Sequence, residues 1–372
     1  MTLLGNRDTR DNVVLTGIDA ALLENFRLID GTTYDQVVAM ANARLSGFNG
    51  TLANDPFWSM LVSFTDRPET RYAVGNSASM VAHTEYGRPD PNRAEMAGHM
   101  LPLRKWDYML GWTADYLEEA RIDDLEQDVG LAIEAAQNRW RISLLQRLIK
   151  RGDESGAANG LSATGLSPGF ATTAASTGVD FTPPSYGGTA FTSTHEHYVT
   201  IAGGAFTTAV FTDAAAELRE HGHEPPYEFF IGASDEAAVM ALSEFLSVNE
   251  ALINAGLLSA QVTFNGDAIN GKRPIGAIEG FRVWVVPGMP QYYGFGFKSY
   301  GANSPLNPVR VRVPLGQSAP ALRLIRDSNN PGIAPVQNLM AQIAFGVGVG
   351  DRTNGTARYV NHADTWADGV AS

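Results

Sequence analysis

Two close pairs of histidines come nearest to the spacing of a metal site. His195 and His197 are separated by one residue, as are His221 and His223. Alternate residues of a strand face the same side, so such a pair with one carboxylate could hold Zn²⁺. We interpret the pairs as polar surface residues and predict no metal site, although a metal at a contact between subunits stays open.

Residues 165–169 read Gly-Leu-Ser-Pro-Gly and match the nucleophile-elbow pattern of serine hydrolases. That elbow needs a strand before it, a helix after it and a backbone N–H on the residue that follows the serine. The surrounding residues 152–194 are rich in Gly, Ala, Ser, Thr and Pro, which is typical of a loop, and Pro168 has no N–H. We therefore expect no catalysis at Ser167.

Two further patterns could carry chemistry. The glycines at 346, 348 and 350 resemble a phosphate loop, but a turn and a strand are predicted after them where a helix would be needed. The acidic cluster from Glu118 to Asp128 reads as a solvated helix face or a partner for basic residues on a neighbour. No segment brings nucleophile, base and orienting residue together, so the sequence predicts no catalytic residue and no cofactor.

Composition limits the function further. The 372 residues carry a net charge of -13, which argues against a protein that grips nucleic acid. There is no cysteine, so disulfides and thiolate chemistry are excluded. No apolar run approaches the roughly 18 residues that span a bilayer, and the polar N-terminus is not a secretory signal. These features predict a soluble protein made in a cytoplasm.

Residues 1–65 are expected to form an extended arm. One helix is predicted from Tyr34 to Leu45 with Thr33 as its cap. Apolar residues such as Phe57 and Trp58 are scattered among helix breakers, so we expect them to pack on another subunit. A poorly packed N-terminal subdomain is the alternative.

Residues 66–112 are predicted to form a long hairpin. Its outgoing side runs from Thr70 to Tyr86, its tip carries two prolines, and its return from His99 to Trp112 alternates apolar and polar residues. A two-stranded hairpin alone is only marginally stable in water. We therefore expect this one to lie against a neighbouring subunit.

Residues 113–151 give the strongest local signal. Apolar residues recur mostly every four positions, which predicts one long helix; they are Leu117, Leu125, Val129, Ile133, Ala136, Trp140, Leu144 and Leu148. Acidic residues crowd its first half and basic residues its second, as the helix dipole favours. Its expected length is nearly 60 Å, at about 1.5 Å per residue, and we expect it to lie across a sheet.

From residue 195 the chain is predicted to be a compact mixed α+β domain. The predicted elements are strands at 195–202, 227–231, 281–286, 309–313, 321–326, 342–349 and 357–360, a strand ending at 297, and helices at 208–220, 235–245 and 248–255. Asn354-Gly355 predicts a hairpin between the last two strands.

The order of these parts resembles the major capsid proteins of tailed bacteriophages. The stretches that carry the likeness are Leu101–Tyr108, Ile278–Pro287 and Phe345–Gly355, which look like the E-loop return, an A-domain strand and the closing P-domain hairpin. By this resemblance, the α+β fold divides into an N-terminal arm (1–65), an E-loop (66–112), a P-domain with the spine helix (113–205), an A-domain (206–335) and a C-terminal return to the P-domain (336–372).

The resemblance implies a structural protein and not an enzyme. Copies of the chain would form pentamers and hexamers of an icosahedral head that encloses double-stranded DNA, in the virion capsid, after assembly in the cytoplasm of a bacterial host. The implied partners are further copies, a separate scaffolding protein, a portal, an optional decoration protein and DNA bound without sequence specificity, with no membrane. The lysines are Lys105, Lys150, Lys272 and Lys298, and none lies at the hairpin tip, so isopeptide cross-linking is not expected.

Five residues are candidates for contacts between subunits. Trp106, Tyr108 and Trp112 are the candidate anchors of the hairpin, because interface energy concentrates in large aromatic residues. Asp351 and Arg352 would meet charged partners where capsomers join, and residues 249–274 would form the A-domain tip at the local axis. Packing within the same chain is the alternative for both groups.

Three other functions stay open. An encapsulin-like compartment would use the same fold to enclose cargo proteins. A metal-dependent enzyme would use His195 and His197. A monomeric binding module would need no copies of itself.

Overall fold

The computed structural model describes most of the chain in two compact units. The described residues are 13–14, 27–74, 95–112, 116, 119–153, 167–172, 181–247, 272–326, 337–361 and 366–369. Unit 1 comprises residues 1–55, 103–141 and 313–345, and unit 2 comprises 56–102, 142–312 and 346–372. Among the described residues, no helix is both long and apolar enough to cross a membrane.

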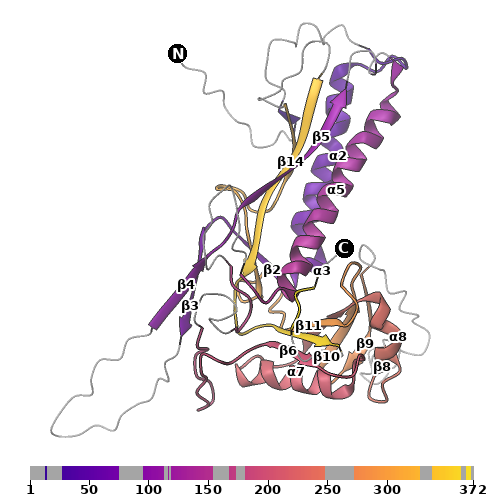
Figure 1. Cartoon of the computed structure of the whole chain (residues 1–372). Coiled ribbons are helices and arrows are strands. Elements are labelled where there is room, and N and C mark those ends of the chain that lie inside the picture. Colours follow the sequence, from indigo (N-terminus) through magenta and orange to yellow (C-terminus); the bar gives the residue numbers. More distant parts are fainter. Residues whose placement is uncertain are drawn as a thin grey trace, which may run out of the picture. The chain divides into compact units, whose positions relative to one another are not determined.

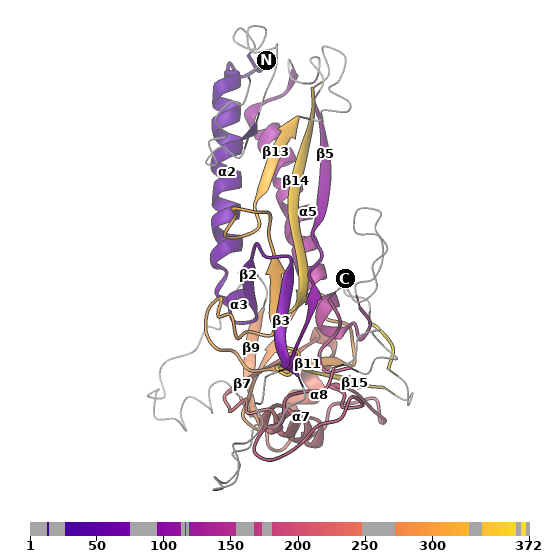
Figure 2. The ribbon, with the colours of Figure 1, turned by 90° about the vertical axis from the view of Figure 1, so that its left-hand side faces the viewer.

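Unit 1 combines two helices with a sheet (Figures 1 and 2). Its elements are β1 (Val13–Val14), α2 (Tyr34–Asn54), β5 (Arg104–Trp112), most of α5 (Ile122–Ile149), β13 (Leu322–Arg326) and the first part of β14 (Gln337–Val349). Strand β14 pairs antiparallel with β13 on one side and with β5 on the other, and β1 pairs parallel with β13. The expected long helix and the sheet are therefore both present.

Helix α2 starts where the sequence predicts and continues further, to Asn54. Thr33 and Gln36 form a capping box at its start, with the Thr33 N–H donating to Gln36 Oε1 at 2.9 Å. One face of the helix is buried, and it is formed by Val37, Ala41, Leu45 and Leu52. The side-chain amide of Asn49 bonds both the N–H and the C=O of Leu322, which fixes α2 to β13.

Helix α5 is shorter than predicted, because it begins at Ile122 and not at 113. Its 28 residues give a length of about 42 Å. Asp30 Oδ2 accepts the Ile122 N–H at 2.9 Å, and this bond is the main cause that lowers the pKa of Asp30 to about 2. An aspartate distant in the sequence therefore caps this helix, which local periodicity could not show. The predicted apolar face is confirmed at Leu125, Val129, Ala136, Trp140, Leu144 and Leu148, all buried.

Unit 2 is built on a seven-stranded sheet covered by helix α7 (Thr208–Glu220). The strand order is β6 (Tyr198–Ile201), β15 (Thr356–Val360), β11 (Tyr293–Phe297), β7 (Tyr227–Ile231), β10 (Phe281–Val285), β9 (Arg273–Ile278) and β8 (Leu246–Ser247). The rings of Phe211, Phe229 and Phe281 pack together in its core. The predicted bounds of α7 and β7 are confirmed; the helix predicted at 235–245 is limited to η1 (Ala233–Asp235) and α8 (Glu236–Met240).

The expectation that Phe57 and Trp58 pack on another subunit is wrong. Both lie in α3 (Pro56–Ser59) and are at most 3% exposed within their own chain. Phe57 stacks on Phe230 and meets Trp284 edge-on, with ring centroids 4.9 and 5.2 Å apart. The next strand, β2 (Val62–Thr65), pairs with β12 (Val309–Arg312), which in turn pairs with the end of β14. Residues 56–65 are thus part of the folded body of unit 2.

The predicted hairpin is confirmed only in part. β3 (Glu69–Val74) and β4 (Glu95–Met100) form a two-stranded antiparallel sheet in which Thr70 faces His99. Residues 75–94, which include the predicted tip, lie outside the described part of the chain. The return strand does not continue to Trp112, because Leu101-Pro102-Leu103 interrupts it and β5 pairs with β14 instead.

The hairpin predicted at Asn354-Gly355 is wrong, since β14 and β15 belong to different sheets. Asn354 is fully buried, and its side chain accepts the Lys298 N–H and donates to the carbonyls of Lys298 and Leu306. Gly348 allows a close approach, since a Cβ there would lie 2.2 Å from Ser167 Oγ and 2.4 Å from Leu101 Cδ2. The predicted helix 248–255 and almost all of the predicted tip 249–274 lie outside the described residues.

Asn354→Ala should lower the free energy of unfolding by about 2–4 kcal/mol, because three backbone groups would lose the buried side chain that pairs them. Chemical denaturation of the purified chain measures this change. Asn54→Ala is the control: Asn54 is exposed and bonds only a carbonyl of its own helix. Equal effects of the two substitutions would contradict the role given to Asn354.

Candidate functional site

The three candidate anchors Trp106, Tyr108 and Trp112 all lie on β5, opposite Ile343, Ala341 and Gln337 of β14. Trp112 is 6% exposed, and its Nε1–H donates to Asp128 Oδ2 at 2.9 Å. Trp112 is therefore buried and bonded within its own chain.

Trp106 and Tyr108 differ in their surroundings. The guanidinium of Arg139 lies 3.5 Å from the centroid of the Trp106 ring, so the indole is half-buried by a cation–π contact within unit 1. Tyr108 is 38% exposed and its neighbour Met109 is 50% exposed. The far edge of β5 pairs with no other strand among the described residues. Tyr108 and Met109 thus leave apolar surface along an open sheet edge.

Arg352 does not lie at the surface where the sequence interpretation placed it. It is 1% exposed, and its guanidinium donates to the Gly169 carbonyl at 3.1 Å, to Tyr72 Oη at 3.3 Å and to Thr172 Oγ1 at 3.1 Å. The Phe181 ring centroid lies 4.2 Å from its Cζ. Burial lowers the pKa of Arg352 from its ordinary value. This arginine joins β3 to residues 169–172 inside unit 2.

Asp351 stays nearer to the solvent. Its Oδ1 accepts the N–H and the hydroxyl of Thr353 at 2.9 and 2.7 Å, which fixes the turn after β14. Its side chain is 31% exposed, and Oδ2 lies 4.0 Å from His223 Nε2. Of the predicted charged pair, only Asp351 presents part of its side chain to an outside partner.

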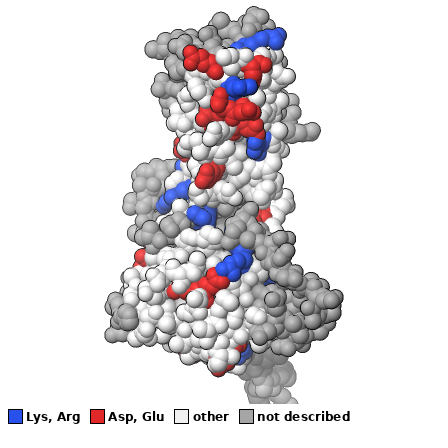
Figure 3. Space-filling model, turned by 90° about the vertical axis from the view of Figure 1, so that its right-hand side faces the viewer, with Lys and Arg blue, Asp and Glu red and all other residues white. Residues whose placement is uncertain are grey.

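The acidic cluster is a helix face with partners in its own unit. Asp123 and Asp124 are exposed, Glu126 forms an ion pair with Arg44 of α2, and Asp128 accepts from Trp112 and Tyr116. Figure 3 shows acidic and basic side chains interspersed over this part of the molecule. In the described part of the cluster, Asp123 and Asp124 thus form a solvated face, as the sequence predicts, and Glu126 and Asp128 bond residues of unit 1.

Ser167 lacks the setting of a nucleophile. It is fully buried at a φ of 48°, its carbonyl accepts from Arg147 Nη1 at 2.8 Å, and residues 167–172 form no helix. A nucleophile elbow would expose the serine at the start of a helix.

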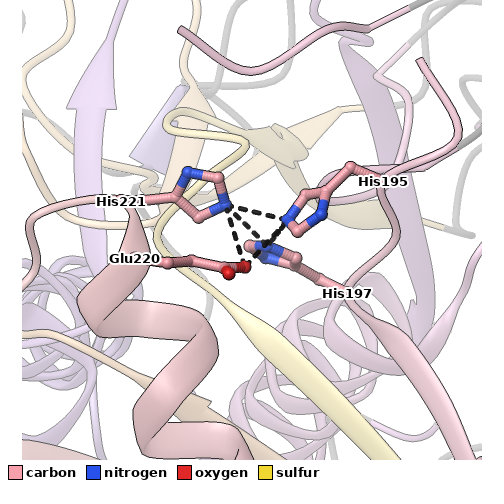
Figure 4. A group of neighbouring side chains, drawn as sticks. All are labelled: His195, His197, Glu220 and His221. Carbon is pink, nitrogen blue, oxygen red and sulfur yellow. Dashed lines mark hydrogen bonds and ion pairs between the residues drawn. The ribbon is translucent and has the colours of Figure 1, made fainter. Parts of the chain in front are cut away.

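The structure brings together three of the four histidines in the two pairs (Figure 4). The Nε2 atoms of His195, His197 and His221 lie 2.9, 3.0 and 3.0 Å from one another. Glu220 Oε1 lies 3.1 Å from His195 Nε2 and 3.7 Å from His221 Nε2.

His223 points elsewhere, to Tyr300 Oη at 2.8 Å and Thr353 Oγ1 at 3.1 Å. The sequence interpretation did not include Glu220. The available signal was that Glu220 and His221 are adjacent at the end of a predicted helix.

Burial disfavours the charged form of these three imidazoles. Burial lowers the pKa of His197 to about 3 and that of His221 to about 2, and it lowers the pKa of His195 as well. Neutral imidazole nitrogens carry the lone pairs that metal ions accept. A surface pair of polar histidines, which the sequence interpretation preferred, does not describe His197, since it is 0% exposed.

Arg352→Lys should destabilise the isolated subunit by about 2–4 kcal/mol. The single ammonium group of a lysine cannot reach all three acceptors that the planar guanidinium bonds. Thermal or chemical unfolding before any assembly measures this. Arg71→Lys is the matched control, since Arg71 is 68% exposed and pairs only with Glu69. An Arg352→Lys subunit of normal stability with defective assembly would restore the interface interpretation.

Comparison with known proteins gives a likeness of structure. No family model matches the chain, and no curated protein matches its sequence. A chain from the structure of Mycobacterium phage Patience is 16% identical, with a TM-score of 0.64, and the match covers 94% of this chain and 96% of that one.

Two further structures are more distantly similar. A chain from the capsid of a native GTA particle is 14% identical, with a TM-score of 0.47 and coverages of 83% and 90%. A chain from the mature capsid of bacteriophage PhiM1 is 12% identical, with a TM-score of 0.45 and coverages of 83% and 86%. The mixed α+β fold predicted from the order of segments is confirmed: the chain has the fold of the tailed-phage major capsid proteins.

Proposed function

We propose that this chain is the major capsid protein of a tailed phage and that its copies form the pentamers and hexamers of an icosahedral head around double-stranded DNA. The observation that carries this proposal is the likeness to the Patience chain over nearly the whole length of both chains.

The sheet formed by β3 and β4 supports assembly. These two strands pair only with each other among the described strands, and within unit 2 Tyr72 of β3 contacts Arg352 and Phe181. Met96 and Met100 of β4 are 60% and 48% exposed. A neighbouring copy that covers these methionines would supply the missing burial.

Strand β5 supplies a second surface of this kind. An open strand edge with apolar side chains favours association unless something covers it. Tyr108 and Met109 stay exposed there, whereas Trp112 is already used within unit 1. Tyr108 is therefore the proposed contact anchor. Trp106, two residues away on the same strand, would support it, and Trp112 stabilises the subunit itself.

The charge of the chain suits a container for DNA. A net charge of -13 gives the protein little affinity for phosphates, so packaged DNA would not adhere to the shell.

The proposal also includes domain boundaries and partners. The proposed domains are 1–65, 66–112, 113–205, 206–335 and 336–372, and the proposed partners are a scaffolding protein, a portal and a decoration protein. Residues 56–65 fold with unit 2, so an arm that reaches a neighbour would have to lie upstream of them.

The proposed role is structural and not enzymatic, and the setting of two motifs supports it. Ser167 is buried and residues 167–172 form no helix. Gly346 and Gly348 lie in β14, and Gly350 directly follows this strand without starting a helix. These two sequence motifs are the ones that resemble a serine nucleophile and a phosphate-binding loop.

Electron microscopy of the chain co-expressed with a scaffolding protein tests the proposed function. Closed icosahedral particles are the expected result, because head-to-tail contacts between copies close into rings when the rotation allows it. Sedimentation of the purified particles should show an assembly of many copies. A chain that remains a compact monomer under all assembly conditions would overturn the proposal.

Tyr108→Ala and Trp112→Ala should separate assembly from folding. Tyr108→Ala should change subunit stability by less than about 1 kcal/mol but reduce particle yield, because it removes exposed contact area. Trp112→Ala should lower subunit stability by about 3–5 kcal/mol. Denaturation of subunits and counting of particles provide the two readouts. Normal particle yield from Tyr108→Ala would remove this residue from the interface.

A further inference from the structure

We propose that His195, His197, His221 and Glu220 bind one Zn²⁺ ion that fixes the start of β6 to the end of α7. The three imidazoles and the carboxylate converge on one point within unit 2 (Figure 4), and their ligand atoms all lie within 4.8 Å of one another. This site is independent of the proposed shell function, because it belongs to the fold of a single chain.

The hydrogen-bonding pattern favours a cation at the centre of the group. His197 Nδ1 lies 2.8 Å from the carbonyl oxygen of Gly355, which only accepts, so the ring proton is on Nδ1. The Nε2 atom of the neutral His197 ring is therefore a bare lone pair, and it faces two other Nε2 atoms at 2.9 and 3.0 Å.

The other two rings cannot resolve this contact. If only one of His195 and His221 carries a proton on Nε2, the Nε2 lone pair of the other ring faces the Nε2 lone pair of His197. If both carry one, their N–H groups face each other at 3.0 Å. Each arrangement leaves one repulsive contact in a buried site, where it is costly. A cation at the centre removes the repulsion, because all three lone pairs can point to it.

Five of the six distances between ligand atoms are close to those of a tetrahedral zinc site. Ligands about 2.0–2.1 Å from a tetrahedral zinc lie about 3.3 Å from one another. The three N–N distances and the shorter N–O distance here are 2.9–3.1 Å, and the longer N–O distance is 3.7 Å, so these five pairs lie within about 0.4 Å of that value. The sixth pair, His197 and Glu220, lies within 4.8 Å. Nitrogen donors with one carboxylate favour zinc over magnesium or calcium, which prefer oxygen ligands.

The surroundings of the four ligands also suit a metal. The bond from His197 Nδ1 to Gly355 fixes the ring and its tautomer, as the outer partner of a metal-bound histidine usually does. Glu220 ends α7 and His221 follows it, so the ion would lie at the negative end of the helix dipole. The nearby Glu217 is already occupied by Thr356 and Arg358.

Four protein ligands indicate a structural ion and not a catalytic one, since a catalytic zinc keeps a position open for water. His195 and His197 precede β6, which is the edge strand of the seven-stranded sheet. The ion would hold this edge strand against the helix that covers the sheet. Glu220 and His195 have side chains that are 35% and 20% exposed, so an ion can enter from the solvent.

Titration of the full chain with Zn²⁺, after removal of metals with a chelator, tests this site. The expected result is one zinc ion per chain by metal analysis and a rise in the thermal midpoint with zinc concentration, because only the folded state holds the four ligands together. Mg²⁺ at the same concentration should give no rise. Co²⁺ in place of zinc should show the visible absorption of a tetrahedral ion. A folded chain that binds no zinc would overturn the proposal.

Three variants locate the ion. His195→Ala, at the exposed side of the group, should weaken zinc binding by about 100-fold or more, and Glu220→Gln by about 10-fold, since both remove direct ligands. His223→Gln is the matched control, because His223 is two residues from His221 but bonds Tyr300 and Thr353. Zinc affinity should be unchanged in that variant. If His223→Gln weakens binding as much as Glu220→Gln does, the four-ligand site is wrong.

Discussion

The constraint on which unit 2 depends is that buried backbone groups outside the regular strands must still find hydrogen-bond partners. Long irregular connections cross this unit, and their carbonyls cannot all be paired in ladders. A few buried polar side chains supply the missing bonds. Asn307 donates to the carbonyls of Ser59, Val62 and Gly301, and Arg147 donates to those of Ser167, Lys150 and Gly152. Arg352 and Asn354 act in the same way after β14.

Asn307 and Arg352 join segments that are far apart in the sequence. Asn307 reaches residues about 250 positions earlier, and Arg352 reaches Tyr72, 280 positions earlier. Leaving such a group without its partner costs about 1–3 kcal/mol, so the connections are fixed as firmly as an apolar core would fix them. The histidine group repeats this principle with a proposed ion as the shared partner: it joins the residues before β6 to the end of α7.

The sequence predicted those elements whose signal is local. The bounds of α7 and β7 follow from one apolar face and one short apolar run, and the structure confirms them. The start of α5 could not be predicted, since the Ile122 N–H is capped by Asp30 from a distant segment. Asn354-Gly355 has the residues of a tight hairpin, but its amide is used to hold Lys298 and Leu306.

The same limit applied to the candidate site. Spacing placed His195 and His197 on one face, yet only the fold could add His221 and Glu220 and exclude His223. Spacing also could not show whether a large side chain is buried and bonded within its own chain or left exposed. Phe57, Trp58, Trp112 and Arg352 are satisfied in this way, and Tyr108, Met109, Met96 and Met100 are not. Residues of the first group stabilise the subunit. Residues of the second group contribute little to that stability, and the proposed association between copies would bury them.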